Sequence, residues 1–543
     1  MIITRLIGSG IAATLLALIA LPAAAQSFQV QCPGSTITHP TAANNNSEPD
    51  YTGATTFTTG AGGYQTPTAK VNGAIKCQQI SGGDGFSTMG DGAQIYMFSF
   101  GPLSGLADMA NGKPGTQFPA VFNTLPPAPL VPGDPATSAG ALDDPLYKQG
   151  DYSNPVKFGF NGAVGLAPDA DCLAEPACAA TIPANGLDGH VDARQIMDVG
   201  VLNGNIPAPL FAIDEDDEFF LTLTNVGQVM RPDLFEQHTV HFHGYPNASA
   251  FYDGVPDASV AINVGGSFTY YYLAPDAGTY FWHCHISPPE HLQMGMVGQL
   301  FVRPRQNRVP INDSMYDALN AQQLDKRTKC GATDILCTNR LPFGATAGSA
   351  PRAATGKYAY NDGDGSTYYD VEVPLQIHGF DPNFHFVGMT FNPENFTDVK
   401  DKYFLLNGRS YPDTVTEGPI ATQTPDGLMH YSQPISAIVS MKAGEKALLR
   451  ISNLNITEFH TLASLGIRMH VIGVNAKLLR DQAGNNLDYY TNSITLGGGE
   501  SLDVILDSTG VPKGTYYLYS ANLDQLSNDA ENFGGLMTEV RVN

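Results

Sequence analysis

The sequence has few basic residues: 28 lysines and arginines are set against 52 aspartates and glutamates in 543 residues, for a formal net charge of −24 at pH 7. This acidity argues against nucleic acid and against an anionic membrane surface as partners, because both would repel the protein. The chain also lacks a long apolar run beyond its N-terminus, so we expect no membrane span in the mature protein. High contents of glycine (57) and proline (38) indicate many turns and short strands rather than helices.

The N-terminus, MIITRLIGSGIAATLLALIALPAAAQS, has the pattern of a secretory signal. Arg5 supplies a positive start, an apolar run follows, and Ala23 to Ala25 provide a small-residue cleavage site. We predict that residues 1–25 are a signal peptide and that the mature protein is secreted or periplasmic. A retained anchor helix is the alternative, although the apolar run is short for a membrane span.

Cysteine is scarce, and its count of seven is odd. In an exported protein an odd count leaves one thiol unpaired. Six cysteines allow about 15 connectivities, and proximity in the sequence suggests the pairs Cys172 with Cys178, Cys330 with Cys337, and Cys32 with Cys77. This arrangement leaves Cys284 free.

Local composition and hydrophobic pattern divide the chain into segments. Residues 26–92 are a polar N-terminal extension, and residues 102–195 are a Pro-, Gly- and Ala-rich insertion that follows a strand-like run at 93–101. Alternating and aromatic runs between turn residues fill 201–305 and return from 371 to 543, with a connector at 306–370. Such runs are typical of antiparallel sandwiches. We therefore predict an all-β protein with two tandem β-sandwiches, at 93–305 and 371–543.

The two predicted sandwiches resemble each other in sequence. FFLTLTN (219–225) matches ALLRISN (447–453), HTVHFHG (238–244) matches HTLASLG (460–466), and GTYFWHCHI (278–286) matches GTYYLYSAN (514–522). Only one histidine repeats, since His460 stands opposite His238. The other positions that carry histidine or cysteine in the first copy hold Ala463, Leu465, Tyr519, Ser520 and Ala521 in the second.

The stretch FWHCHISPPEHLQMGM (281–296) crowds metal-binding side chains together. Cys284, His291 and Met296, with His238 from the earlier run, make up one thiolate, two imidazoles and a weak thioether. This is the ligand set of a blue electron-transfer copper site. Met294 is a second candidate thioether. Zinc is the competing metal, but structural zinc sites usually take four strong ligands, often several cysteines.

A second group of histidines follows from strand geometry. Successive side chains on a strand point to opposite faces, so His283 and His285 point away from the site that Cys284 faces. His241 and His243 likewise share one face. We predict that these four histidines converge on a second metal locus. The alternative is that they are hydrogen-bonded strand residues without a metal.

At this point the sequence resembles the multicopper oxidases. HTVHFHG, DGVPD (253–257), GTYFWHCHI, HLQMGMVGQLFV and NGNIPAP (203–209) look like that family's copper-binding strands. The resemblance implies two cupredoxin-like Greek-key sandwiches, and it favours Met296 over Met294. Carried over by motif, the type 1 copper ligands are His238, Cys284, His291 and Met296. Half of the family's eight-histidine trinuclear copper cluster is matched by His241, His243, His283 and His285.

The sequence departs from the family in two places. SPPE lengthens the loop between Cys284 and His291, as in two-domain copper nitrite reductases, and the second sandwich lacks the other four histidines. The remaining histidines of that half, His378, His385, His430 and His470, form no HxH pair. Because the second domain of every identical subunit lacks these histidines, a homo-oligomer could complete the eight-histidine cluster only where two first domains face each other.

The nitrite-reductase design fits less well. His243 and His283 match two of its type 2 copper ligands, but no histidine stands near Ala521 or Asn522, where the third would lie. The position of its catalytic aspartate falls on His241. Nitrite reduction is therefore disfavoured.

Two hypotheses for function follow. The first is an exported copper-dependent oxidoreductase that oxidises a small organic or metal-ion reductant by one-electron steps, with dioxygen as acceptor, as the family resemblance implies. The second is a non-catalytic blue-copper electron carrier or copper-binding protein. The missing second set of histidines favours the carrier. The four histidines beside Cys284 favour the enzyme, since a carrier has no need of them.

Overall fold

The computed structural model describes residues 56–59, 65–69, 75–102, 202, 204–228, 230–231, 233–244, 249–264, 266–274, 276–322, 350–354, 357–390, 395–425, 429–481 and 485–543. The predicted signal peptide, nearly all of the predicted insertion and the side chains of the three predicted disulfides lie outside this part of the chain. Within the described residues, no helix has the length and apolar character needed to cross a membrane.

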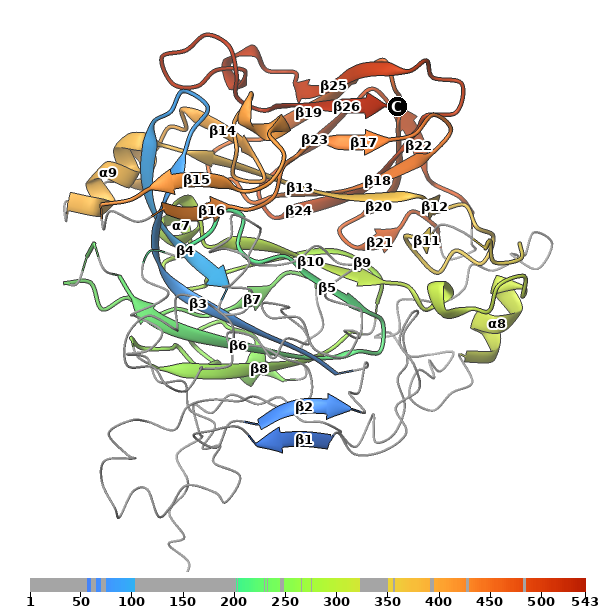
Figure 1. The fold of residues 1–543 in the computed structure, drawn as a ribbon, viewed down its shortest axis with the longest axis horizontal. Helices are drawn as coiled ribbons and strands as arrows, with labels where there is room; N and C mark the ends of the chain where they lie inside the picture. Colours follow the sequence, from blue (N-terminus) through green and yellow to red (C-terminus); the bar gives the residue numbers. More distant parts are fainter. Residues whose placement is uncertain are drawn as a thin grey trace, which may run out of the picture.

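The first domain is built from two sheets (Figure 1). One sheet has the order β4-β3-β6-β8, with β3 (Ile75–Thr88), β4 (Gln94–Pro102), β6 (Glu218–Gly227) and β8 (Ser267–Leu273). The other has the order β5-β10-β9-β7, with β5 (Phe211–Asp214), β7 (His241–Phe242), β9 (Gly278–His283) and β10 (Val297–Arg303). Aromatic side chains fill the space between the sheets: Trp282 packs against Phe100 and Phe211 with ring centroids 4.9 Å apart in each pair. The predicted β-sandwich is confirmed.

The first sheet begins earlier in the sequence than the predicted domain start at residue 93. β3 lies in the middle of this sheet, parallel to β6 and antiparallel to β4. The sequence predicts an extension before residue 93 because those residues are polar and show little periodicity. The partner β6 is more than 100 residues away in sequence, so local pattern carried no sign of this pairing.

The second domain repeats the two-sheet design. Its first sheet has the order β14-β13-β18-β24-β20-β21, with β13 (Val371–Phe380), β14 (Tyr403–Leu406), β18 (Lys446–Asn453), β20 (Met469–Val474), β21 (Lys477–Leu478), β24 (Glu500–Asp507) and, paired with β20, β22 (Tyr489–Thr491). Its second sheet has the order β17-β26-β25-β19-β23, with β17 (Val439–Met441), β19 (His460–Leu465), β23 (Ser493–Leu496), β25 (Gly514–Ser520) and β26 (Met537–Val542). A core of aliphatic side chains, including Leu449, Leu462 and Val504, separates them.

Smaller elements surround the two sandwiches. The two-stranded pairs are β1 (Thr56–Thr59) with β2 (Gln65–Ala69), β11 (Lys357–Tyr358) with β12 (Tyr368–Tyr369), and β15 (Ile420–Gln423) with β16 (Met429–Gln433). The helices are α7 (Pro288–Gln293), α8 (Met315–Gln322) and α9 (Pro382–Thr390), and the short 3-10 turns are η3 (Ala250–Tyr252), η4 (Arg305–Arg308), η6 (Phe396–Asp398), η7 (Asp413–Val415) and η8 (Leu523–Gln525). Most of α8 and η4 lie in the predicted connector, beside the first domain (Figure 1).

The domains meet through the sheet that carries β9 and β10, which packs against β13, β18 and β24 (Figure 1). A buried charge network crosses this interface. Glu372 of the second domain accepts hydrogen bonds from Arg303 of the first domain at 2.9 Å and from Arg450 of its own domain at 2.7 Å. Because buried charges are costly unless paired, this network specifies how the two sheets dock.

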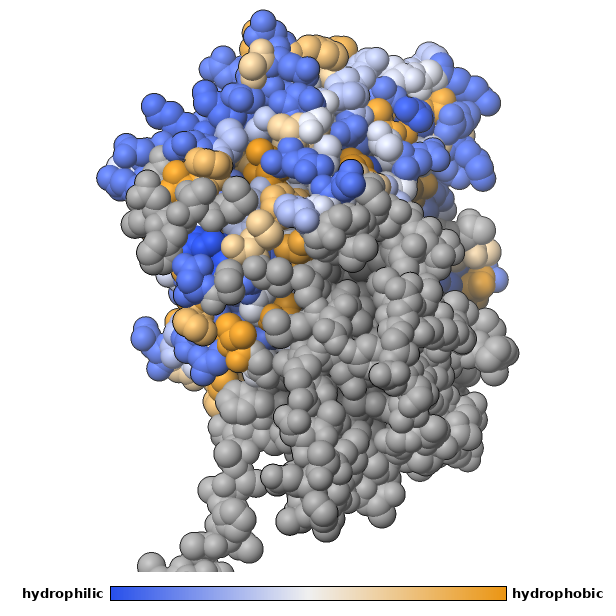
Figure 2. All heavy atoms as spheres, turned by 60° about the vertical axis from the view of Figure 1, so that its left-hand side comes forward, coloured by the Kyte–Doolittle hydropathy of each residue, from blue (hydrophilic) through white to orange (hydrophobic). Residues whose placement is uncertain are grey.

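The visible outer surface of the second domain is largely hydrophilic, with hydrophobic side chains scattered among polar ones (Figure 2). This distribution agrees with the strongly acidic composition.

Candidate metal centres

The predicted type 1 residues come together at one end of the first domain. Cys284 directly follows β9, His291 lies in α7, and Met296 precedes β10, so a single β9–α7–β10 connection supplies three of them. The backbone N–H of Cys284 donates to the carbonyl of Met296 at 3.2 Å, which extends the β9–β10 ladder beneath the site. His238 enters from the segment before β7.

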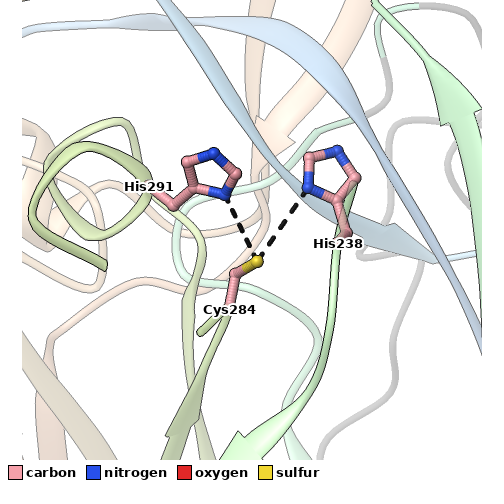
Figure 3. Close-up of side chains that lie close together, drawn as sticks. All are labelled: His238, Cys284 and His291. Carbon is pink, nitrogen blue, oxygen red and sulfur yellow. Dashed lines mark hydrogen bonds between the residues drawn. The ribbon is translucent and has the colours of Figure 1, made fainter. Parts of the chain in front are cut away.

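The side chains of Cys284, His238 and His291 point toward one another (Figure 3). The Cys284 Sγ lies 3.2 Å from His291 Nδ1 and 4.0 Å from His238 Nδ1. Metal–nitrogen and metal–sulfur bonds of about 2.0 and 2.3 Å at trigonal angles would place nitrogen and sulfur about 3.7 Å apart. The observed separations lie on either side of this value, so the three side chains fit one ion.

The chemistry of the donor set selects the metal. Cys284, His238, His291 and Met296 are all fully buried, and a buried set of one thiolate and two imidazoles with a thioether matches blue copper rather than zinc. Among the described residues, the Nε2 atoms of His238 and His291 have no partner within hydrogen-bond distance. Their Nδ1 atoms face the sulfur, so these are the nitrogens that would bind copper.

The electrostatics of the site favour a metal-binding thiolate. Burial alone would raise the pKa of the Cys284 thiol, but the imidazoles of His291 and His238 lower it well below its ordinary value. The thiolate is the form that ligates metals. Burial lowers the pKa of His291, yet Cys284 and Glu236 together raise it to about 9. The Glu236 carboxylate lies 3.6 Å from His291 Nε2.

A close backbone approach that the sequence interpretation missed holds His238 in place. A Cβ atom at Gly82 of β3 would lie 2.6 Å from His238 Cδ2, so only glycine lets β3 pass this close to the ring. The sequence feature that could have predicted this contact is the run ISGGDG (80–85), because glycine inside a strand often marks the close approach of another residue to the backbone. Phe98 of β4 packs edge-on against His291, with ring centroids 5.1 Å apart.

The second domain anchors α7, the helix that carries His291. The Gln293 side chain donates to the buried Asp401 carboxylate at 3.1 Å, and His385 Nε2 donates to the Gln293 carbonyl at 3.0 Å. Asp401 also accepts a hydrogen bond from Asn455 at 2.7 Å. Burial raises the pKa of Asp401. Sequence reasoning did not find these residues, because nothing local in the sequence shows that 293, 401 and 455 meet.

Three of the four histidines predicted for the second locus come together. His241, His243 and His283 each offer a ligand atom within 4.8 Å of the others, and the Nε2 atoms of His243 and His283 are 2.9 Å apart. His241 Nδ1 donates to the Asp253 carbonyl at 2.7 Å, which turns its Nε2 away from Asp253. His285 lies beside this trio, its ring centroid 5.0 Å from that of His241.

These three imidazoles are held in the neutral form that binds metal. Burial, together with the neighbouring histidines, lowers the pKa of His283 to about 3 and that of His243 to about 4. Burial also lowers the pKa of His241. Neutral imidazole is a common metal ligand, and copper(II) is among the ions that imidazole suits.

The two centres are joined through adjacent residues. His283 Nδ1 donates to the carbonyl oxygen of Cys284 at 2.7 Å. The type 1 thiolate and one histidine of the second cluster are therefore connected both by the chain and by a hydrogen bond. This contact also fixes the His283 tautomer: Nδ1 carries the hydrogen, so Nε2 accepts the hydrogen bond from His243 Nε2 at 2.9 Å.

A cleft of about 350 Å³ opens beside the histidine cluster, between the two domains. Its first-domain wall contains His243, Phe281, His283 and Leu292. Its second-domain wall is made of the segment that follows β18 and of two glycines before β24, namely Leu454, Asn455, Ile456, Thr457, Glu458, Phe459, Gly498 and Gly499.

The second-domain residues that align with the histidines do not lie on this wall. Ala463 and Leu465 belong to β19, and Tyr519 and Ser520 to β25, in the sheet farther from the first domain (Figure 1). His460, the one aligned histidine, is buried and accepts a hydrogen bond from Asn455 at 2.8 Å. It is a structural residue in this fold.

Comparison with known proteins agrees with this geometry. Sequence profiles described as "Multicopper oxidase" match residues 188–307 and, separately, residues 392–537. Multicopper oxidase MCE of Talaromyces pinophilus is 31% identical over 25% of this chain and 24% of its own length. Laccase abr2 of Aspergillus fumigatus is 32% identical over 23% of this chain and 20% of its own length. A crystal structure of Blue Copper Oxidase from Nitrosomonas europaea superposes over 86% of each chain, with 16% identity and a TM-score of 0.46.

The chain thus spans about a quarter or less of the length of these two curated relatives. The two profile matches cover β5 to β10 of the first domain and β14 to β25 of the second, and the first match includes all four type 1 residues and the histidine cluster. The two matched regions are those of the multicopper oxidase family.

Proposed function

We propose that this protein is an exported copper-dependent oxidoreductase. It takes single electrons from a small organic or metal-ion reductant at the type 1 site and passes them to dioxygen at the histidine cluster. The observation that carries the proposal is the contact between His283 Nδ1 and the Cys284 carbonyl at 2.7 Å. It connects a buried copper site to a second set of metal ligands that borders an open cleft.

The residues of each centre have distinct tasks. Bound copper supplies one-electron redox chemistry at each centre. Around the type 1 residues, the aromatic and aliphatic core of the first domain excludes water, and the α7 anchor and Gly82 fix His291 and His238. A rigid site of this kind changes little between oxidation states, which favours rapid electron transfer.

At the histidine cluster, the side chains would bind the metal and the hydrogen bonds around them orient the rings; they do not exclude water. Asp253 and the Cys284 carbonyl set the tautomers of His241 and His283, as second-layer partners do at metal sites. The cleft gives a small acceptor access to His243 and His283. Its volume exceeds that of several water molecules at about 30 Å³ each, so dioxygen and its solvent fit.

Oxygen consumption by the copper-loaded protein with candidate reductants tests the proposal. We expect the wild type to consume oxygen, Cys284→Ser to lose this activity, and His470→Gln to retain it, because His470 lies in β20 outside both sites. Wild-type protein whose blue copper is reduced but which consumes no oxygen would instead support the electron carrier.

Export is tested by the N-terminus of the mature protein. The signal-like residues 1–25 support a mature chain that begins at Gln26. N-terminal sequencing of protein recovered outside the cytoplasm should find this start. Recovery of the full-length chain from the cytoplasm would contradict it.

A further inference from the structure

The histidine nitrogens lie close enough together to bind one ion. His243 Nε2 and His283 Nε2 are 2.9 Å apart, the separation of a hydrogen bond between the two rings. Bound at about 2.0 Å to one metal at a tetrahedral angle, two such nitrogens would lie about 3.3 Å apart, only a few tenths of an ångström farther. His241 completes a trio within 4.8 Å. These three side chains, all from the first domain, therefore describe the coordination sphere of a single metal.

The wall opposite this trio offers no comparable ligands for further ions. Among the residues that line the cleft, the imidazoles are those of His243 and His283, and there is no thiol. The second-domain wall presents the polar side chains of Asn455, Thr457 and Glu458, of which Asn455 and Thr457 are hydrogen-bonded to Asp401 and Glu458 to Gln525. Nitrogen ligands of the kind that copper(II) prefers are thus confined to one side of the cleft.

The fold also keeps the aligned second-domain positions away. Leu465 on β19 and Tyr519 on β25 lie in the second sheet of that domain, whereas β13, β18 and β24 of the first sheet face the first domain. Among the described residues, the second domain therefore closes the cleft without contributing an imidazole to it. A trinuclear cluster does not fit the side chains that the structure places here.

We propose that the histidine cluster binds a single copper ion through His241, His243 and His283, with its open side toward the interdomain cleft. This inference rests on the proposed function, because it specifies the acceptor site of that enzyme. With one copper at the type 1 site and one at the cluster, a chain stores two electrons rather than four.

Two stored electrons are the number that reduces dioxygen to peroxide. A fully reduced chain gives dioxygen two electrons, and with two protons from solvent the product is one molecule of hydrogen peroxide. Reduction of the same dioxygen to two molecules of water needs four electrons and four protons. The reductant supplies the two electrons in one-electron steps through the type 1 site.

Copper content and electron uptake test the inference on the intact copper-loaded protein. We expect two coppers per chain, two electrons per chain in an anaerobic reductive titration, and two EPR signals that each integrate to one copper. Four coppers, uptake of four electrons, or an EPR-silent pair of ions would overturn it.

Two variants separate the one-copper site from a larger cluster. His243→Ala should lose one copper and keep the blue signal. His285→Ala should keep two coppers, because His285 stands outside the trio, whereas a trinuclear cluster would lose metal with either change. Copper loss in both variants overturns the inference. Circular dichroism of each variant verifies that the fold is retained.

A peroxide assay separates this inference from the proposed function. One peroxide for each dioxygen consumed is expected, and four-electron reduction to water overturns the one-copper site. Absence of oxygen consumption in a protein with two coppers and two-electron uptake would overturn the oxidase function alone and leave the one-copper site standing.

Discussion

The buried carboxylate of Glu372 lies at the domain interface, and its contribution to the free energy of unfolding can be estimated from its pKa. Its side chain is only 7% exposed and lies between the guanidinium groups of Arg303 and Arg450. Burial by itself would raise the pKa of Glu372, but the two arginines lower it from 4.5 to about 2. This lowering of the pKa corresponds to about 3 kcal/mol, because each factor of ten in the proton equilibrium is about 1.4 kcal/mol. We therefore expect Glu372→Gln to lower the free energy of unfolding at pH 7 by about 3 kcal/mol.

The pH dependence of this effect follows from the direction of the shift. A carboxyl group whose pKa is lower in the folded state contributes its full stability above the unfolded pKa, about 4.5. That contribution is lost as the pH falls through about 2. The difference between wild type and Glu372→Gln should therefore be largest at pH 7 and should shrink between pH 4.5 and pH 2.

Urea denaturation followed by circular dichroism measures both quantities. Lys446→Gln is the control, because it removes a charge from the half-exposed pair with Asp507, which should contribute less than about 1 kcal/mol. If Glu372→Gln costs no more than this control at pH 7, or if its cost does not change with pH, the reasoning about the interface network is refuted.

Three further predictions concern the copper sites. Gly82→Ala places a Cβ 2.6 Å from His238 Cδ2. We therefore expect a perturbed blue copper spectrum and a free energy of unfolding that is lower by about 1–3 kcal/mol. An unchanged spectrum would argue against the close packing of β3 on His238. Asp401→Ala removes the hydrogen-bond acceptor of Gln293 and Asn455. It should lower the free energy of unfolding, measured by urea denaturation, by about 1–3 kcal/mol and shift the type 1 copper signal. A stability loss with no spectral shift would mean that Asp401 does not position α7. Removal of copper by a chelator should lower Tm, since a ligand at a thousandfold its Kd stabilises the folded state by about 4 kcal/mol, and an equal Tm with and without copper would count against preformed sites.

Local sequence was enough to predict the type 1 site and the fold class. Three of the four ligands lie within one short connection, Cys284 to Met296, and the alternating strands give the sandwich pattern directly. The side chains of His241, His243 and His283 were predicted to point toward one locus because side chains alternate between the two faces of a strand. These features depend on neighbours in the chain, so they can be inferred without knowledge of distant pairings.

The supports of the site depend on contacts that cross the chain, and sequence reasoning missed them. β3 pairs with β6 across a separation of more than 100 residues, and this pairing brings Gly82 to His238. The Gln293–Asp401 contact joins two domains. The position of β19 and β25 on the far sheet, away from the cleft, also depends on how the domains dock, which no local pattern records.

Copper-edge X-ray absorption of the copper-loaded protein tests the central claim most directly, because it identifies the atoms bound to copper. The account predicts a short copper–sulfur distance in addition to imidazole nitrogens, and loss of that sulfur contribution in Cys284→Ser while the nitrogen contribution of the histidine cluster remains. A wild-type spectrum with only nitrogen and oxygen neighbours, or a sulfur contribution that survives in Cys284→Ser, would contradict the assignment of Cys284 as the ligand that joins the type 1 copper to the second centre.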